Sequence, residues 1–303
     1  MSQPVSKAQK AAFVAIVGRP SVGKSTLLNA LCGHKVAIVS KTPQTTRNRV
    51  RGIVTRPEGQ LVFIDTPGFH RSKRRFNRQM RGLIQETIRD AELVLYVADA
   101  SRHPGPEEEQ LLKVVAGEEH IPAVVALNKI DLNATRAATE IDQLVRQFLP
   151  RAPVVPVSAK GAGGLDGLMG ELFALAPEGD QLYPQEFYTD QDPEFRVAEL
   201  IREQAITGLK QELPHSLYVD LADMEVHEES AGEVLSLRAF ILVERESQKG
   251  ILVGKGGSRI KQIRLSATKE IEALFPYRVD LDLRVKVDSN WRDNEQVLKR
   301  LVT

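Results

Sequence analysis

The residue pattern with the clearest chemistry lies at positions 18–25, which read Gly-Arg-Pro-Ser-Val-Gly-Lys-Ser. They fit G-x-x-x-x-G-K-[ST], a loop that cradles nucleotide phosphates with its backbone amides. Glycines allow such a chain to approach the phosphates closely. In this pattern Lys24 reaches the β- and γ-phosphates and Ser25 reaches Mg²⁺. The predicted phosphate-binding residues are Gly18, Arg19, Pro20, Ser21, Val22, Gly23, Lys24, Ser25 and Thr26.

A second polar group, Asp-Thr-Pro-Gly at residues 65–68, directly follows an apolar run. A carboxylate at a strand end can hold the Mg²⁺ shell through water, which is the role we predict for Asp65. The amide of Gly68 can lie against a γ-phosphate. The tetrapeptide alone is equally consistent with an ordinary turn, and its position after the phosphate loop favours the nucleotide interpretation. The predicted residues here are Asp65, Thr66, Pro67, Gly68 and Phe69.

A third group, Asn-Lys-Ile-Asp at residues 128–131, follows another apolar run. The carboxylate of Asp131 can accept hydrogen bonds from guanine N1–H and the 2-amino group, a donor pair that adenine lacks. Losing a buried partner costs about 1–3 kcal/mol, so this residue can enforce base choice. The alternative is a helix N-cap. The amide of Ala159 can donate to guanine O6. The predicted base-side residues are Asn128, Lys129, Asp131, Ser158, Ala159 and Lys160.

Short apolar runs must position these groups. Up to about residue 176 they alternate with helical periodicity, which predicts an α/β domain with a mostly parallel sheet wrapped by helices. Ligands bind such sheets at the carboxyl ends of the strands, where the polar groups stand. The predicted strands are residues 12–17, 61–64, 93–97, 123–127 and 154–157.

Composition sets the broad class. A chain of 303 residues favours two domains, and 42% hydrophobic with 27% charged residues argues against wholesale disorder. A net charge of +1 decides little, so any claim of nucleic-acid binding must rest on local clusters. The single Cys32 excludes an intramolecular disulfide. No apolar run approaches the roughly 20 residues that span a bilayer, and we expect a cytoplasmic protein.

Regular periodicity stops at residues 177–194, which we interpret as a linker between a domain at 1–176 and a second at 195–303. The second domain reads helix-strand-strand-helix-helix-strand-helix. Between its second and third helices stands Gly-Lys-Gly-Gly at 254–257, which fits the G-x-x-G loop that clamps nucleic-acid backbone in KH domains. A solvated basic helix face is the alternative. The predicted RNA-binding residues are Gly254, Lys255, Gly256, Gly257, Arg259 and Lys261.

The phosphate loop, D-x-P-G, N-K-x-D and S-A-K groups in this order resemble a translation-factor-class P-loop GTPase over residues 13–175. The resemblance implies GTP and GDP as ligands and Mg²⁺ as cofactor. It also implies that Thr46, or alternatively Thr45, coordinates Mg²⁺ in the GTP state. The metal ligands would then be Ser25, Thr46 and Asp65, and the catalytic residues Lys24, Thr46 and Gly68.

Two positions depart from related GTPases. Ras-like enzymes place a water-orienting Gln after D-x-x-G, whereas this chain has Phe69, which cannot hydrogen-bond water. We therefore predict slow intrinsic hydrolysis. Related enzymes with cation-stimulated activity usually carry Asn at the position of Ser21, which leaves potassium dependence open.

Joined to the second domain, which resembles a type II KH domain, the whole pattern is similar to the Era family of bacterial ribosome-assembly GTPases. Further matches lie at residues 44–47, 187–190 and 243–246. The family implies binding near the 3′ end of small-subunit (16S) ribosomal RNA and a role in 30S assembly. It also implies peripheral association with the cytoplasmic face of the inner membrane, although the sequence shows no anchor. We expect a monomer. An RNA-binding module with a structural nucleotide, or another RNA-directed GTPase, remains an alternative.

Overall fold

The computed structural model describes residues 9–40, 49–66, 82, 84–133, 135–209, 217–230, 232–289 and 291. The chain forms two compact units, and the main boundary between them falls between Asp190 and Gln191. Each unit has its own sheet and its own hydrophobic core. We call them the first and the second unit and describe each by itself. Four predicted site residues lie outside the described residues: Thr46, Pro67, Gly68 and Phe69.

The first unit is built on a six-stranded sheet in the order β2-β3-β1-β4-β5-β6. Only β2 and β3 pair antiparallel, and all other neighbours are parallel. The predicted sheet lacked β2, whose sequence, Val-Arg-Gly-Ile-Val-Thr-Arg, contains a glycine and two arginines. The strands are β1 (Lys10–Val17), β2 (Val50–Arg56), β3 (Gly59–Asp65), β4 (Leu93–Asp99), β5 (Ala123–Asn128) and β6 (Val154–Val157).

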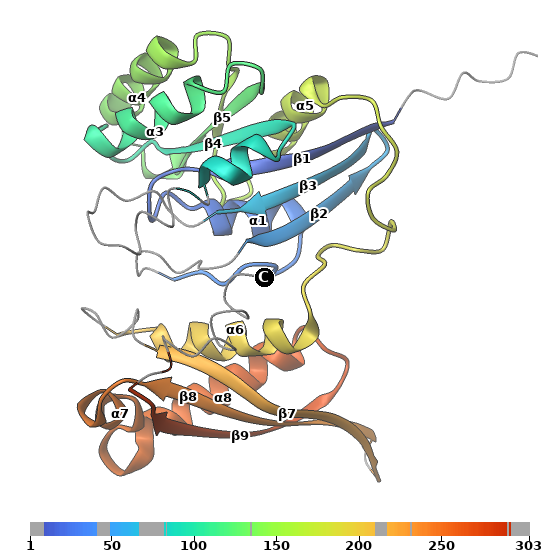
Figure 1. Cartoon of the computed structure of the whole chain (residues 1–303), viewed down its shortest axis with the longest axis vertical. Coiled ribbons are helices and arrows are strands. Elements are labelled where there is room, and N and C mark those ends of the chain that lie inside the picture. Colours follow the sequence, from blue (N-terminus) through green and yellow to red (C-terminus); the bar gives the residue numbers. More distant parts are fainter. Residues whose placement is uncertain are drawn as a thin grey trace, which may run out of the picture. The chain divides into compact units, whose positions relative to one another are not determined.

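Helices cover both faces of this sheet, as the upper part of Figure 1 shows. Leu27 and Leu28 of α1 pack in one core cluster with Val14, and Leu111 of α3 packs in the other with Ala15. Successive residues of a strand point to opposite faces, so β1 is buried on both sides. The helical elements are α1 (Lys24–Cys32), α3 (Pro106–Ala116), η1 (Ile130–Leu132), α4 (Thr135–Phe148) and α5 (Leu165–Leu175).

The second unit has a three-stranded sheet in the order β7-β8-β9, with β7 and β8 antiparallel and β8 and β9 parallel. Apolar residues of α6, α7 and α8 pack against it in one cluster (Figure 1). The predicted helix at 290–301 lies almost wholly outside the described residues. The elements are α6 (Pro193–Ile206), β7 (Leu217–Glu229), β8 (Gly232–Val243), α7 (Glu246–Val253), η3 (Lys255–Gly257), α8 (Ser258–Glu272) and β9 (Arg278–Val287).

Residues 177–190, which fall in the predicted linker, belong to the first unit and are hydrogen-bonded to it. The buried amide of Gln60 on β3 accepts hydrogen bonds from the backbone N–H groups of Leu182 and Tyr183 and donates one to the Tyr183 carbonyl. Further along, the Thr189 hydroxyl donates to the carbonyl of Arg51 at 2.8 Å. This segment therefore follows the edge of the sheet beside β2 and β3.

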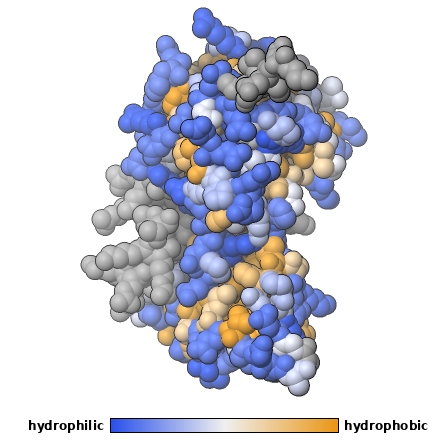
Figure 2. All heavy atoms as spheres, turned by 90° about the vertical axis from the view of Figure 1, so that its right-hand side faces the viewer, coloured by the Kyte–Doolittle hydropathy of each residue, from blue (hydrophilic) through white to orange (hydrophobic). Residues whose placement is uncertain are grey.

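On the face shown in Figure 2, hydrophilic residues predominate and hydrophobic ones form smaller patches between them. Among the helices of the described part of the chain, none has the combined length and apolarity needed to cross a membrane.

Candidate functional site

The predicted phosphate loop connects the carboxyl end of β1 to the first residue of α1, Lys24. Gly23 precedes the helix with φ of 100°, a conformation that costs a residue with a Cβ about 1–2 kcal/mol. A Cβ at this position would also lie 2.5 Å from Nδ2 of Asn128. The loop thus depends on glycine here, and it leads into a helix N-terminus, where backbone N–H groups favour anions.

Lys24 lies inside this loop. Its side chain is buried, and Nζ donates to the carbonyl oxygens of Gly18 and Arg19, both at 3.1 Å. Burial lowers the pKa of Lys24 below its ordinary value, and the nearby carboxylates of Asp65 and Glu108 oppose that effect. A bound phosphate would add negative charge beside this buried ammonium and favour its charged form.

Two predicted metal ligands meet where the first turn of α1 lies beside the carboxyl end of β3. The Ser25 hydroxyl donates to Oδ2 of Asp65 at 2.6 Å, so a hydroxyl and a carboxylate converge on one point. Mg²⁺ prefers such oxygen ligands, and these residues therefore fit that ion. The neighbouring Thr66 hydroxyl instead donates to the carbonyl of Ile16 at 2.7 Å, so this side chain anchors the strand end.

Asn128, at the end of β5, joins the two halves of the predicted site. Its Nδ2 donates to the carbonyl of Val22 in the phosphate loop at 2.9 Å, and its Oδ1 accepts from the amide of Ala159 at 3.0 Å. The Asp131 carboxylate, which is exposed, accepts a hydrogen bond from the Ser158 hydroxyl at 2.7 Å. The groups at residues 128–131 and 158–160 are thus brought together beside the phosphate loop, as the sequence predicts.

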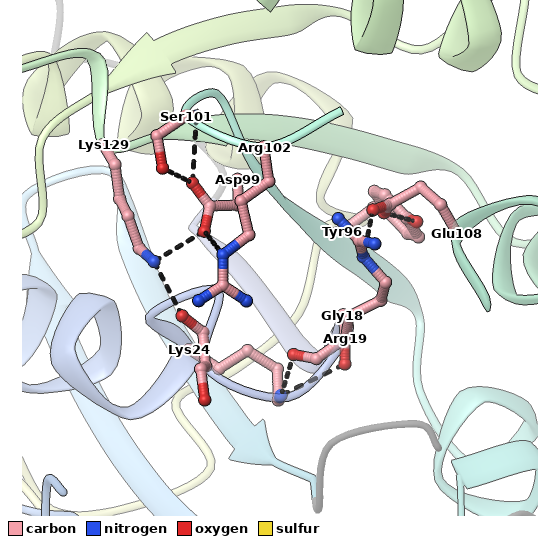
Figure 3. Close-up of polar contacts among 10 residues, drawn as sticks. Gly18, Arg19, Lys24, Tyr96, Asp99, Ser101, Arg102, Glu108 and Lys129 are labelled. Carbon is pink, nitrogen blue, oxygen red and sulfur yellow. Dashed lines mark hydrogen bonds and ion pairs between the residues drawn. The ribbon is translucent and has the colours of Figure 1, made fainter. Parts of the chain in front are cut away.

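Lys129 points along the same edge. Its Nζ donates to the carbonyl of Ser21 at 2.7 Å and to Oδ2 of Asp99 at 2.6 Å (Figure 3). Ser21 and Lys129 also have positive φ angles, 63° and 70°. Positive φ in residues other than glycine is uncommon and clusters at functional sites.

The predicted RNA loop of the second unit lies at a helix junction. α7 ends at Val253, η3 forms the loop itself and α8 begins at Ser258. Gly254 has φ of 73°, and a Cβ there would lie 2.8 Å from Cβ of Arg259. The side chains of Lys255 and Lys261 are exposed, whereas Nη2 of Arg259 donates to the carbonyl of Thr207 at 3.1 Å. The loop therefore presents lysine and glycine backbone to solvent.

Comparison with known proteins bears on both units. A family profile described as "50S ribosome-binding GTPase" matches residues 13–129, and one described as "KH domain" matches residues 212–292. GTPase Era of Treponema denticola is 43% identical over 290 residues, covering 95% of this chain and 98% of that protein. GTPase Era of Borreliella burgdorferi (strain ZS7) is 45% identical over 293 residues, covering 97% of this chain and 99% of that protein. The chain belongs to the GTPase Era family.

Two solved Era structures also align with nearly the whole chain. Era in complex with MgGDPNP and nucleotides 1506–1542 of 16S ribosomal RNA has a TM-score of 0.89 at 32% identity, over 97% of this chain and 100% of that one. An Aquifex aeolicus Era variant bound to GDP.AlF4⁻ gives the same TM-score, identity and coverage.

Membership in the Era family confirms the predicted fold class, a P-loop GTPase domain with a mostly parallel sheet followed by a KH domain. It also confirms the predicted activity: the chain is a GTPase, an enzyme that hydrolyses GTP. The contact that each site residue makes with nucleotide, Mg²⁺ or RNA stays a prediction.

Sequence reasoning predicted Arg19 in the phosphate loop but missed two side chains behind it in this Era-family GTPase, Tyr96 and Glu108. Glu108 on α3 is fully buried, accepts a hydrogen bond from the Tyr96 hydroxyl and pairs with Nε of Arg19 at 2.5 Å (Figure 3). Burial raises the pKa of Glu108 above its ordinary value, although Tyr96 and Arg19 both act to lower it. Only the helical periodicity of α3, which puts this glutamate on the same face as Leu111 and Leu112, could have indicated a buried carboxylate.

Proposed function

We propose that this Era-family GTPase binds GTP and GDP at the phosphate loop and binds small-subunit ribosomal RNA near its 3′ end through the loop at residues 254–257. Its role would be the assembly and maturation of the 30S subunit. One observation carries the proposal: the same chain contains two sites. In one, Asn128 joins the phosphate loop to the base-side residues, and the other is the Gly-Lys-Gly-Gly helix junction with its exposed lysine. That chain aligns over 97% of its length with an Era bound to MgGDPNP and 16S nucleotides 1506–1542.

In the nucleotide site, the loop amides and Lys24 would hold the phosphates, and the Asp131 carboxylate would receive the guanine N–H donors. The bridge made by Asn128 supports this division, because one side chain fixes both the loop and the residues that face the base. The amide of Ala159 already uses its proton for Asn128, so its donation to guanine O6 would be a second, shared bond.

Ser25 and Asp65 would hold Mg²⁺, with Thr46 as a further ligand in the GTP state. The 2.6 Å contact between the Ser25 hydroxyl and the Asp65 carboxylate supports this assignment. When bound, Mg²⁺ neutralises charge on the phosphate oxygens. The backbone amide of Gly68 would contact the γ-phosphate. Because Phe69 cannot orient water, intrinsic hydrolysis would be slow and would gain from a partner side chain, a monovalent cation or a basic switch residue of this chain.

In the second unit, the glycines of the loop would let RNA phosphates approach the backbone, and Lys255 and Lys261 would supply positive charge. Their exposure supports this role. The contact of Arg259 with Thr207 indicates that this arginine also fixes the end of α6. A cytoplasmic location, peripheral membrane association and a monomeric state remain part of the proposal.

The proposal is tested by titrating an RNA oligonucleotide with the sequence of 16S nucleotides 1506–1542 into the protein. We compare the native chain with the Lys255→Asp, Gly256→Asp double variant. Reversing a charge in the loop should weaken binding by about tenfold or more and reduce its salt dependence.

The matched control is Lys269→Asp, which reverses a charge at the last turn of α8, away from the loop. It should bind RNA like the native chain. Equal losses in the loop variant and the control would leave only non-specific electrostatic attraction, and undiminished binding in the loop variant would place the RNA elsewhere.

A further inference from the structure

Asp99 is the last residue of β4, and none of the motifs predicted from sequence contains it. Its side chain is fully buried. In the sheet it pairs in register with Asn128, so the end of β4 lies directly beside the residues that would face the base. Burying a carboxylate destabilises the folded state unless the group is paired and hydrogen-bonded. Asp99 has partners of both kinds.

Both carboxylate oxygens of Asp99 are occupied. Oδ1 accepts from the hydroxyl and the amide of Ser101, at 2.6 and 3.0 Å, and Oδ2 accepts from Nζ of Lys129 at 2.6 Å (Figure 3). Nε of Arg102, whose side chain is mostly exposed, lies 3.5 Å from Oδ2. The ammonium of Lys129 also donates to the carbonyl of Ser21. The carboxylate is thus fixed by Ser101 and in turn holds Lys129 against the phosphate loop.

This pair is ionic. Burial acts to raise the pKa of Asp99, but the hydrogen bonds from Lys129 and Ser101 outweigh it and hold the pKa below its ordinary value. Asp99 is therefore a carboxylate at neutral pH. An ammonium with two of its three donors committed, one to a charge, cannot swing freely into solvent.

We propose that Asp99 is a positioning residue of the guanine nucleotide site. By holding the ammonium of Lys129 on the carbonyl of Ser21, it fixes the lysine's hydrocarbon chain beside the base-side residues and keeps the phosphate loop joined to them. The inference rests on the proposed function, since it assumes that nucleotide binds at this edge. It adds the carboxyl end of β4 to those of β1, β3 and β5.

The variant Asp99→Asn preserves shape and an acceptor for Ser101 but removes the charge that faces Lys129. We expect the dissociation of a fluorescent GDP analogue to accelerate about tenfold, because a buried charge pair has been broken. The rate of GTP hydrolysis at saturating nucleotide should change much less than the rate of dissociation, since neither Asp99 nor Lys129 is among the residues predicted to contact the γ-phosphate. A general loss of structure would instead accelerate dissociation and lower the rate of hydrolysis together.

A double-mutant cycle shows whether Asp99 acts through Lys129. We measure the affinity of the GDP analogue for the native chain, Asp99→Asn, Lys129→Met and the double variant. Each single change should weaken binding about tenfold, and the double variant should be no weaker than Lys129→Met, because the interaction is already lost. Asp142→Asn, which affects an exposed i,i+4 pair on α4, is the matched control and should bind like the native chain.

The outcomes separate this inference from the proposed function. If Lys129→Met binds weakly while Asp99→Asn is unaffected, or if the two effects multiply, the positioning role is wrong and the nucleotide site stands. If the native chain does not bind the analogue, or Lys129→Met binds it unchanged, the assignment of the site itself fails. Should Asp99→Asn not fold, Ser101→Ala removes a hydroxyl that orients the same carboxylate and should accelerate dissociation about threefold. An unchanged rate in Ser101→Ala would then overturn the inference.

Discussion

At the scale of single residues, the nucleotide site combines strained backbone with charges that have little contact with water. Ser21 and Lys129 have positive φ angles, and Nζ of Lys129 donates a hydrogen bond to the carbonyl of Ser21. The spacing of G-x-x-x-x-G-K-[ST] made the loop predictable, because only that pattern brings amides, a lysine and a hydroxyl to one point. Asp99 could not be predicted in the same way. It merely ends an apolar run, and its role depends on which strand lies beside it.

The requirement for glycine at position 23 gives a direct prediction. Gly23→Ala introduces a Cβ at φ of 100° and 2.5 Å from Nδ2 of Asn128. The hydrogen bond from this Nδ2 to the Val22 carbonyl must therefore lengthen or break. We expect GDP affinity to fall about tenfold or more, as measured by equilibrium titration. The matched control is Gly33→Ala, which also has positive φ but open space around the new Cβ. It should lower stability and leave GDP affinity intact, and equal affinity losses in both variants would contradict the account.

Base selection is a second property at this scale. Asp131→Asn replaces the carboxylate that would accept both guanine donors, so we expect the preference for GTP over ATP to fall. The loss should be about 1–3 kcal/mol, because the bound base would cover this exposed carboxylate and its donors would be left without their partner. Competition of GTP and ATP against a fluorescent GDP analogue measures the preference directly. An unchanged ratio would remove Asp131 from the base contact.

At the scale of elements, the predicted strands and the mostly parallel sheet follow from apolar runs that alternate with helical periodicity. Two features did not follow. β2 has a weak strand pattern, and its pairing with β3 is visible only in the sheet. Residues 177–190 lack periodicity because they are held by side chains such as Gln60 rather than by regular backbone pairing. Irregular segments of this kind have no sequence period to recognise.

The hydrogen bonds of Gln60 should therefore raise the free energy needed to open residues 177–190 locally from the first unit. In Gln60→Ala the backbone groups of Leu182 and Tyr183 lose their partners, and local opening should become easier by about tenfold. Chymotrypsin cleavage within residues 177–190, which contain Phe187 and Tyr188, should accelerate accordingly. Gln147→Ala, at an exposed position of α4, is the control. Equal cleavage rates in the native chain and Gln60→Ala would show that the segment is held by other contacts.

At the scale of the whole molecule, two units with separate cores are joined in one chain, one carrying the nucleotide residues and the other the glycine-lysine loop. The net charge of the chain does not reveal that the two units bind different ligands, because acidic residues elsewhere in the chain offset the basic residues at positions 255, 259 and 261. A GTPase joined to an RNA-binding unit can act as a switch, since GTP and GDP order different segments around the phosphates. The proposed role in 30S assembly belongs to this level.

The most direct test of that role is crosslinking and sequencing of the cellular RNA bound to the GTP form. The native chain is compared with the folded Lys255→Asp, Gly256→Asp variant and with the Lys269→Asp control. We expect enrichment of the 3′ end of small-subunit ribosomal RNA with the native chain and the control, and its loss with the loop variant. No enrichment, or enrichment that survives in the loop variant, would contradict the assignment of the second unit to ribosomal RNA.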